Sequence, residues 1–480
     1  MARSNERGIT PQGEDFSAWY NELVLRAELA DRGPARGTII IRPYGYRIWE
    51  LIEEELDRRI KQTGHLNAYF PLLIPESHLR KEAEHVGGFA PELAVVTHGG
   101  GKELDEPLVV RPTSETVVGE AFARWIDSYR DLPMLINQWA NVVRWELRPR
   151  LFLRTTEFLW QEGHTAHASE KEALAEAMTA VGFYEEIARD ICAIPVVIGE
   201  KTASERFAGA QRTFALEALV RDGRALQAAT SHYLGTNFAR AFDMTFTNES
   251  GVLEHCFTTS WGMSTRMIGA IIMTHGDDKG LILPPRVAPF QVVIVPIGRD
   301  KEIDSVMTAA RELNDSLRSS RVRVHLDERT QLSPGFKFNE WELRGVPLRI
   351  ELGPRDLSAS VATFVDRLTG EKEQVPIKDA ASEIASRLEL FQGALYDRAQ
   401  SFRDEHTSVV DTWDDFVTAV GQGFASALLC DDVGCELRIK DLTTATPRVI
   451  PFDGLSENGP CISCGRPSTY PVRILFARAY

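Results

Sequence analysis

The sequence predicts a multidomain protein that combines the α/β and α+β fold classes. At 480 residues, the chain is long enough for about two to four domains and a large core. Up to about residue 286, amphipathic helices mix with apolar strands that alternate in polarity. Beyond that point strands and helices alternate, which favours a parallel or mixed sheet covered by helices, and paired cysteines follow near the end.

The composition is typical of a soluble globular protein, with 43% hydrophobic and 26% charged residues. No apolar run is long enough to span a bilayer, and the polar N-terminus lacks a signal-peptide core, which favours the cytoplasm. The formal net charge of −15 argues against a general nucleic-acid coat protein. A local basic patch would still suffice for binding one RNA, and six cysteines in so long a chain do not indicate a disulfide framework.

Apolar periodicity predicts the first elements. Residues 14–30 form a helix, and after a turn GTIII at 37–41 forms a short buried strand. A second amphipathic helix covers 46–61. The apolar run AYFPLLIP at 68–75 contains two prolines, which indicates an edge or interface strand.

The segment RPTSET at 111–116 lies between an apolar run and a helix that extends to about residue 130. Thr113 or Ser114 suits the N-cap of this helix, a common position for hydroxyl side chains.

Residues 142–167 predict two strands joined by an arginine-rich loop. From Phe152 to Trp160, residues with different surroundings alternate along the second strand. The segment carries Arg144, Arg148, Arg150 and Arg154. Guanidinium groups and aromatic faces suit a polyanion with a flat ring, such as ATP. An ordinary half-buried hairpin with solvated arginines also fits this pattern.

The next elements form a scaffold. A helix begins at Ser169 with a capping box completed by Glu172, and IPVVIGEKT at 194–202 is a strand. A two-residue hairpin is predicted at Asp222-Gly223. Three polar side chains then share one face of the second strand, or nearly so across a bulge: Gln227, Thr230 and His232. A purely structural histidine is the alternative there.

The block TSWGMSTRMIGAIIMTHGDDKGLILPPRVAP at 259–289 predicts a strand followed by a helix that begins near Ser264. Gly262 allows a ligand to approach the backbone closely. Arg266 lies in the first helical turn, where the helix dipole disfavours a cation. A bound triphosphate would offset that cost, and a surface arginine is the alternative.

Three blocks in this order resemble the motifs of class II aminoacyl-tRNA synthetases, and prolyl-tRNA synthetases in particular: RPTSET, RWE followed by FLRTTEFLWQEGHTAH, and the block at 259–289. The resemblance covers nearly the whole chain. It implies a catalytic core built on an antiparallel sheet at 1–287, an α/β anticodon-binding domain at 288–394, and a small α/β zinc-binding domain at 395–480. It also implies motif 1 at about 46–78, motif 2 at about 140–167 and motif 3 at about 257–286.

The resemblance implies that the protein attaches L-proline to tRNA(Pro) through a prolyl-adenylate, using ATP with Mg²⁺. Motif 1, which by resemblance ends near Pro75, implies a homodimer, whereas the pattern alone fits equally well a helix packed on its own core. Arg144 and Arg266 would be catalytic. Arg144 would bridge the α-phosphate and the proline carboxylate and stabilise charge in the in-line displacement. No general base is evident.

By the same resemblance, the ATP site would contain Arg144, Glu146, Arg154, Thr155, Phe158, Gln227, Thr230 and Arg266. The proline site would contain Thr113, Glu115, Arg144, Trp160, Glu162, His164, His232, Ser260 and Gly262. A secondary ammonium has two N–H donors, which a carboxylate and a hydroxyl can both accept. Thr113 and Glu115 would therefore contact the imino group of proline.

The anticodon would be bound by stacking and by hydrogen bonds to splayed bases. The candidate residues, each of which also fits a plain surface position, are Phe336, Lys337, Glu340, Arg349 and Arg355.

The cysteines of CDDVGC and CISCG form two close pairs, Cys430 with Cys435 and Cys461 with Cys464. Four cysteines so spaced suit a tetrahedral, structural Zn²⁺. The other two cysteines, at 192 and 256, lack such partners and fit core or free thiols. A C-terminal zinc domain that ends in an aromatic residue, here Tyr480, resembles the archaeal and eukaryotic type of prolyl-tRNA synthetase.

Fewer than about a hundred residues separate His164 from Ser260. That length leaves no room for the inserted editing domain of typical bacterial prolyl-tRNA synthetases. Because small amino acids are hard to reject by pocket shape, mischarging with alanine is expected, and with cysteine it stays open.

Three alternatives remain: a threonyl- or seryl-type synthetase, a synthetase-like regulator that binds tRNA without charging it, and a zinc-dependent nucleic-acid-binding module. The threonyl type needs a Cys–His–His zinc set that the core lacks, and regulators usually lose motif residues that are present here. The net charge weighs against the third.

Overall fold

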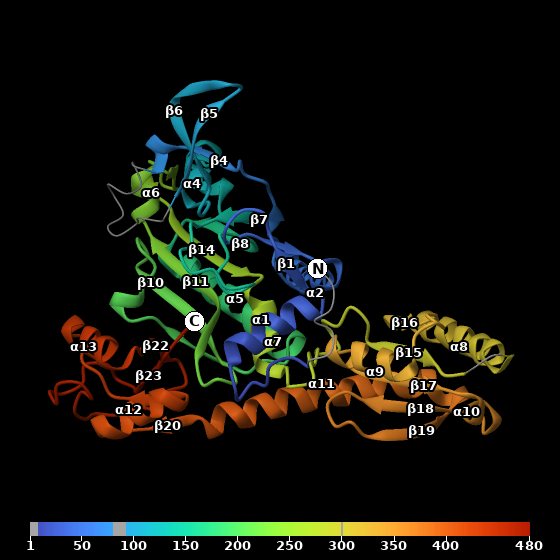
Figure 1. Ribbon diagram of the computed structural model, residues 1–480. Coiled ribbons are helices and arrows are strands. Elements are labelled where there is room, and N and C mark those ends of the chain that lie inside the picture. Colours follow the sequence, from blue (N-terminus) through green and yellow to red (C-terminus); the bar gives the residue numbers. More distant parts are fainter. Residues whose placement is uncertain (1–7, 80–92, 299–300) are drawn as a thin grey trace.

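The computed structural model describes residues 8–79, 93–298 and 301–480. An eleven-stranded sheet passes through the middle of the molecule and continues into its C-terminal part (Figure 1). The strand order is β20-β21-β23-β22-β9-β10-β11-β14-β8-β7-β3. No helix in the described ranges is both long and apolar enough to cross a membrane.

The central strands of this sheet pair in antiparallel fashion, as the family resemblance implies. They are β7 (Met134–Val143), β8 (Glu157–His167), β9 (Val196–Glu200), β10 (Arg212–Leu219), β11 (Ala225–Gly235) and β14 (Phe257–Ser264). A short parallel strand, β3 (Leu66–Asn67), closes one edge beside β7.

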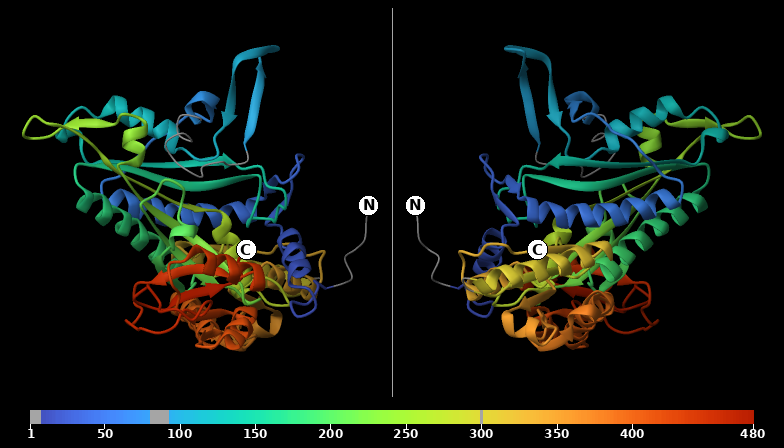
Figure 2. Two further views of the ribbon diagram at one scale, coloured as in Figure 1. Left: turned by 90° about the vertical axis from the view of Figure 1, so that its left-hand side faces the viewer. Right: turned by 90° about the vertical axis from the view of Figure 1, so that its right-hand side faces the viewer.

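Helices cover one face of the sheet, and Figure 2 shows the long α2 running along it. They are α1 (Phe16–Arg26), α2 (Pro43–Gln62), α5 (Glu170–Glu186) and α7 (Arg266–His275). Their apolar sides and the sheet form the largest core, in which the buried indole of Trp261 packs against Phe183 and Tyr184. The predicted capping box starts α5, because Ser169 and Glu172 exchange hydrogen bonds. The opposite face of the central strands is left for a pocket.

Smaller elements surround the core. Two helices lie at its far end, α4 (Glu115–Trp125) and α6 (Asn237–Ala241). The accessory strands are β1 (Ala30–Arg32) with β2 (Ile39–Ile41), β4 (Leu73–Pro75) with β6 (Lys102–Val110) and β5 (Ala94–Gly99), and β12 (Thr245–Thr247) with β13 (Leu253–His255). The β5–β6 hairpin projects from the molecule (Figure 2). Short 3-10 or π turns cover Tyr129–Asp131, Ile187–Ile191, Ala203–Glu205 and Ile377–Asp379.

The segment after residue 288 forms a five-stranded mixed sheet with its own core, as the alternating pattern predicts. Its strands are β15 (Val292–Pro296), β16 (Val324–Leu326), β17 (Leu348–Leu352), β18 (Val361–Asp366) and β19 (Lys372–Pro376), and its helices are α8 (Lys301–Ser319), α9 (Pro334–Leu343) and α10 (Pro354–Ser358). Helix α11 (Ala380–Glu405) leads from this sheet to the C-terminal unit (Figure 1).

The C-terminal unit has a core of its own, yet its sheet is continuous with the central one. Its elements are β20 (Thr407–Val409), α12 (Trp413–Gln422), β21 (Phe424–Ala427), α13 (Val433–Thr443), β22 (Thr446–Pro451) and β23 (Ile474–Ala477). Strand β22 pairs with β9 through Ile450 opposite Glu200 and Pro451 opposite Gly199. A Cβ at Gly199 would lie 2.2 Å from the carbonyl oxygen of Ile450, so this close approach requires glycine.

Two helix ends differ from the sequence prediction. The first helix ends at Arg26 rather than residue 30, because Glu28 adopts a left-handed φ of 60° and the chain turns into β1. The helix that begins at Glu115 ends at Trp125 rather than near residue 130, and a 3-10 turn follows.

The strand predictions also need correction. The second hairpin strand begins at Glu157 rather than Phe152, which is buried with a φ of 60°. The strand at 39–41 is not buried, since Ile40 is 53% exposed. The turn at Asp222-Gly223 is longer than two residues, because the amide of Val220 donates to the carbonyl of Arg224.

Candidate active site

A cavity of about 280 Å³ lies on the uncovered face of the central strands. Its walls come from segments that are far apart in the sequence: the start of α4, strands β8, β11 and β14, and the loop after β9. The lining residues are Thr113, Glu115, Arg144, Phe158, Trp160, Glu162, His164, Lys201, Glu205, Phe207, Thr213, Gln227, Ala228, Ala229, Thr230, His232, Ser260, Trp261, Gly262, Met263, Ser264 and Arg266.

Strand register orders these side chains along the cavity. At one level His232 lies opposite Ser260, which lies opposite His164. The next levels toward the motif 2 loop are Thr230–Gly262–Glu162 and then Ser264–Trp160. A bulge brings the predicted residues of β11 to the same wall, because the pairing of β10 with β11 skips Ala228. The cavity therefore has a histidine-rich end and an arginine-rich end.

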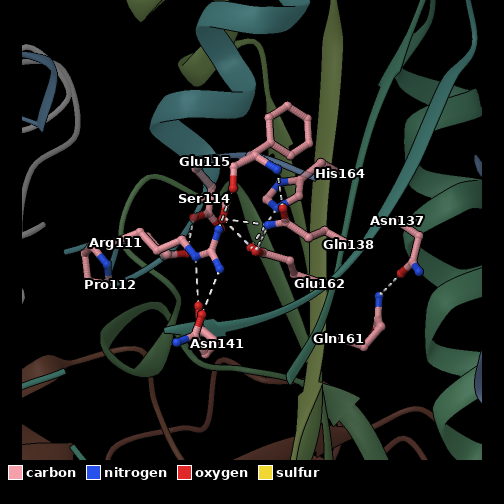
Figure 3. Close-up of polar contacts among 12 residues, drawn as sticks. Arg111, Pro112, Ser114, Glu115, Asn137, Gln138, Asn141, Gln161, Glu162 and His164 are labelled. Carbon is pink, nitrogen blue, oxygen red and sulfur yellow. Dashed lines mark hydrogen bonds and ion pairs between the residues drawn. The ribbon is translucent and has the colours of Figure 1, made fainter. Parts of the chain in front are cut away.

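The carboxylate of Glu162 is the most enclosed acidic group of the cavity, and Figure 3 shows its contacts. It accepts hydrogen bonds from Ser114 Oγ at 2.6 Å, from Gln138 Nε2 at 2.6 Å and from His164 Nε2 at 3.0 Å. Burial opposes ionisation of Glu162, but these donors and the charge of His164 outweigh it and lower the pKa of the carboxyl group. Conversely, Glu162 raises the pKa of the buried His164 against the effect of burial.

The segment RPTSET enters the cavity at the start of α4. Ser114 occupies the N-cap position, but its side chain makes no cap and instead donates to Glu162. Thr113 donates through its hydroxyl to the carboxylate of Glu115, and both side chains line the cavity. The sequence allowed either an N-cap or a substrate contact for this segment. In the structure no side-chain cap forms, and Thr113 and Glu115 line the cavity.

His232 is held as a neutral ring. Its Nδ1 lies 3.1 Å from Thr213 Oγ1, and the ring stacks on Phe207 with centroids 4.4 Å apart. Burial and the nearby charge of Arg144 lower the pKa of His232 to about 3. At neutral pH this imidazole therefore adds a polar but uncharged wall to the cavity.

Arg144 extends into the cavity between two aromatic rings. Its guanidinium carbon lies 5.5 Å from the ring centres of Phe158 and Trp160, and its Nε donates to Pro112 O at 3.0 Å. Among the described residues that line the cavity, three have a buried side-chain polar atom without a hydrogen-bond partner: Trp160 Nε1, Ser260 Oγ and Trp261 Nε1. Unsatisfied buried donors in a cavity favour a polar ligand.

Arg266 begins α7, as the sequence predicts, and its Nε donates to Leu153 O at 3.1 Å. Burial and the like charges of Arg144 and Arg154 lower the pKa of Arg266 to about 10. The guanidinium thus stays charged at neutral pH, in a place that an anion would stabilise.

Three of the residues assigned to ATP from the sequence do not line the cavity. Thr155 is buried and its hydroxyl donates to Glu157 O at 2.7 Å, so its contact is structural. Arg154 is exposed, and Glu146 lies near Arg144. The remaining assigned residues of both substrate sites do line it.

Sequence reasoning missed one wall, formed by Lys201, Glu205, Phe207 and Thr213. The only sequence signal for this wall was Lys201 itself, at the polar end of an apolar strand, and a lysine in that position is too common to indicate a site. Only the sheet pairing brings this wall to the others.

The anticodon candidates differ in accessibility. Phe336 is 52% exposed and Arg355 is exposed. Lys337 is 2% exposed and donates to Asp327 O at 3.1 Å, so it is not free to contact a base. Glu340 pairs with Arg329 and Arg344. Arg349 pairs with Glu351 and lies 4.3 Å from the ring centre of Phe338.

The four paired cysteines come together in the C-terminal unit, with their sulfurs within 4.8 Å of one another. Cys430 Sγ lies 3.5 Å from that of Cys435 and 3.8 Å from that of Cys464. Arg466 Nε donates to Cys464 Sγ at 3.3 Å, which favours a thiolate. This set fits a tetrahedral Zn²⁺, whereas Cys192 and Cys256 are buried apart from it.

Comparison with known families agrees with this architecture. Residues 96–275 match the tRNA synthetase class II core domain (G, H, P, S and T), and residues 291–387 match the anticodon binding domain. Residues 413–480 match the C-terminal domain of prolyl-tRNA synthetase. The fold and the site therefore define a class II aminoacyl-tRNA synthetase.

Individual relatives narrow the class further. The chain is 62% identical to proline--tRNA ligase 2 of Rhodococcus jostii (strain RHA1) over 100% of both chains, and 59% identical to proline--tRNA ligase of Mycobacterium leprae (strain Br4923) over 99% of both. A crystal structure of prolyl-tRNA synthetase from Cryptosporidium parvum, complexed with halofuginone and AMPPNP, gives a TM-score of 0.94 at 41% identity, and the match covers 98% of this chain and 99% of that one. The chain belongs to the prolyl-tRNA synthetase family.

The pair of Glu162 and His164 predicts a pH-dependent contribution to stability. Because the folded pKa of His164 is raised, the contribution is fully present below the unfolded histidine pKa of about 6.5 and is lost as pH rises through the folded pKa. We expect His164→Gln to lower the thermal midpoint Tm most at pH 6, with a smaller difference from the wild type at pH 9. A difference in Tm that grows with pH would contradict a charged pair.

Proposed function

We propose that this protein is a proline--tRNA ligase, which activates L-proline with ATP and transfers the prolyl group from prolyl-adenylate to tRNA(Pro). The observation that carries this proposal is the single cavity that joins Arg144 and Arg266 to Thr113, Glu115 and the buried pair at its other end. An amino acid beside a nucleotide has a cationic nitrogen at one end and phosphates at the other. The charges of the cavity match both ends.

Arg144 supplies the central contact in this proposal. Its position between the charged groups at both ends of the cavity lets it bridge the proline carboxylate and the α-phosphate, two anions that otherwise repel. The same guanidinium stabilises charge that develops during in-line attack. Arg266 lies where it can bind the outer phosphates. Phe158 offers a ring face to adenine, and Gln227 and Thr230 complete that wall.

The other end of the cavity holds proline. Thr113 and Glu115 accept the two N–H groups of the secondary ammonium. Trp160, His164, His232, Ser260 and Gly262 surround the ring and the carboxylate, with the unpaired donors of Trp160 and Ser260 available to it. Glu162 acts mainly by fixing the wall, since Ser114, Gln138 and His164 already occupy its oxygens.

The cofactors in this proposal are ATP with Mg²⁺ and one structural Zn²⁺. Mg²⁺ would accompany the phosphates of ATP and offset their charge. The zinc would be held by Cys430, Cys435, Cys461 and Cys464, none of which lines the cavity, and would stabilise the C-terminal unit.

For tRNA(Pro), the mixed-sheet domain at 291–387 binds the anticodon. Of the candidates, Phe336 and Arg355 are exposed and suit stacking or hydrogen bonding to a splayed base. Lys337 is left out of this proposal because it is buried and paired.

A homodimer accounts for the exposed apolar residues near the sheet edge at β3 and β4. Leu66 is 69% exposed, Tyr69 72% and Leu73 43%. An unpaired sheet edge flanked by apolar side chains is a typical contact surface, and a second copy of the chain is the proposed occupant.

Proline-dependent ATP–pyrophosphate exchange tests the reaction. We expect exchange with proline to exceed that with any other amino acid, and a weaker signal with alanine. Arg144→Ala should lower exchange by about 10²-fold or more, the size seen for lost transition-state donors. Arg148→Ala, an exposed arginine of the same loop, serves as the matched control and should exchange normally. Near-normal exchange by Arg144→Ala would refute the role of Arg144.

Metal analysis tests the zinc site. We expect one zinc per chain, and Cys461→Ser should lower both the zinc content and Tm, because a ligand is lost from a closed four-sulfur site. Cys256→Ala, a buried cysteine outside the cluster, should retain the zinc. Full zinc occupancy in Cys461→Ser would exclude this ligand set.

Light scattering tests the dimer. We expect a mass of twice the 53.7 kDa chain, and a shift toward the monomer for Tyr69→Glu, which places a charge in the apolar contact. Leu390→Glu, at a residue 71% exposed on α11, should leave the mass unchanged. A wild-type monomer at micromolar concentration would rule the dimer out.

A further inference from the structure

A buried ion cluster links the C-terminal unit to the wall of the cavity. Glu217 on β10 accepts a hydrogen bond from Lys201 Nζ at 2.8 Å. Arg448 on β22 donates to the same carboxylate through Nη2 at 2.9 Å and through Nε at 3.2 Å, which makes the contact bidentate. The cluster therefore contains one group from the C-terminal unit and two from the catalytic core.

The three side chains are almost fully enclosed: Glu217 is 0%, Lys201 3% and Arg448 7% exposed. Two cations and one carboxylate leave a net charge of +1 inside the protein. A buried charge is costly unless it is paired. Within the described residues, Glu205 is a further carboxylate whose charge acts on Lys201 and which also lines the cavity, and an anionic ligand beside Lys201 would stabilise the excess cation further. Of the three, Lys201 is the one that lines the cavity.

The ammonium of Lys201 has unused hydrogen-bonding capacity. It carries three N–H donors, and among the described side chains only Glu217 accepts from it. The backbone of Lys201 is fixed by its amide, which donates to Thr213 O at 2.8 Å. Thr213 contacts His232 at one end of the cavity, and Glu217 pairs in register with Gln227 toward the other. The side chain of Lys201 therefore extends from the level of Thr213 toward that of Gln227, the ATP side in the proposed function.

The C-terminal unit holds the flanks of Lys201 as well. Before it, Gly199 pairs with Pro451 across the sheet. After it, Thr202 Oγ1 donates to Glu436 Oε2 at 3.2 Å, and Ser204 donates to the same carboxylate. The segment that carries Lys201 is thus attached to the C-terminal unit on both sides.

We propose that Arg448 is a positioning residue for ATP binding: it holds Glu217, which in turn aims the ammonium of Lys201 at the phosphates of ATP in the cavity. This inference rests on the proposed function for the identity of the ligand. Arg448 fixes the orientation of the carboxylate of Glu217 by its bidentate contact. Without Arg448 the carboxylate is free to turn, and the ammonium of Lys201 is no longer held toward the phosphates.

Equilibrium binding of Mg-ATP to the full-length, zinc-loaded protein, measured by isothermal titration calorimetry without proline, tests this proposal. Arg448→Met should raise the Kd for ATP about tenfold, the effect of one lost charge-assisted contact. Lys201→Met should raise it at least as much, and Arg448→Lys should recover part of the loss. In exchange assays, Arg448→Met should raise the KM for ATP more than it lowers kcat.

Arg473→Met is the matched control, because Arg473 is similarly enclosed in the same unit and pairs with Asp411 and Glu457 away from the cavity. It should leave the Kd for ATP unchanged even if Tm falls. In a Glu217→Gln background, Arg448→Met should add no further loss, since its effect passes through that carboxylate. Either single change leaves a buried charge without its partner and could destabilise the fold. The double variant Glu217→Gln/Arg448→Met removes both charges of the pair, so it keeps the test valid if a single variant misfolds.

Three outcomes would overturn the proposal: an unchanged Kd for ATP in Arg448→Met, an equal change in Arg473→Met, or effects of Glu217→Gln and Arg448→Met that multiply. Absence of proline-dependent exchange in the wild type would instead refute the proposed function. The Kd values for ATP of the variants relative to the wild type would still decide the role of Arg448, because they are measured without turnover.

Discussion

The catalytic core depends on the burial of one carboxylate. Glu162 is 1% exposed, and a charge in that position is stable only when its oxygens are fully paired. Its donors come from three elements: Ser114 at the start of α4, Gln138 on β7 and His164 on β8 itself. Satisfying this one group therefore attaches α4 to the sheet, and that attachment brings Thr113 and Glu115 into the cavity.

A second organising feature is the distribution of charge around the cavity. The carboxylate of Glu162 is satisfied by the protein, whereas Arg144 and Arg266 each donate through Nε to a backbone carbonyl and line the cavity. The neutral His232 adds no further cation to the cavity. Carboxylates of Glu115, Glu162 and Glu146 lie close enough to act on the charge of Arg144. Cations fixed in this way are preorganised for phosphate, because no reorganisation is needed when charge develops on the ligand. Pairing of the β-strands stabilises the positions of these arginines, and that pairing does not depend on their charges.

Local sequence patterns predicted the elements better than their ends. Alternation located β8, the capping box located α5, and strand–helix alternation located the mixed sheet, since each depends on contacts within a few residues. The ends depended on single backbone conformations. Glu28 and Phe152 adopt left-handed φ values, which their residue types do not predict. The first helix and the strand β8 were therefore predicted too long. Thr155 was assigned to ATP because it lies in the motif, but its side chain points to a backbone carbonyl instead.

The sequence by itself determined the kind of site: three ordered blocks carry both arginines, most of the acids and one histidine of the cavity, and two cysteine pairs carry four sulfurs that fit a metal. These groups are encoded at short range, so their spacing is visible in the chain. Only the tertiary structure decided which of them meet. The contact of Lys201 with Glu217, those of Ser114 and Gln138 with Glu162, and the attachment of Arg448 to Glu217 all join segments separated by more than about ten residues along the chain. Such contacts result from strand order and register, which no local pattern specifies because they are settled by packing of the whole sheet.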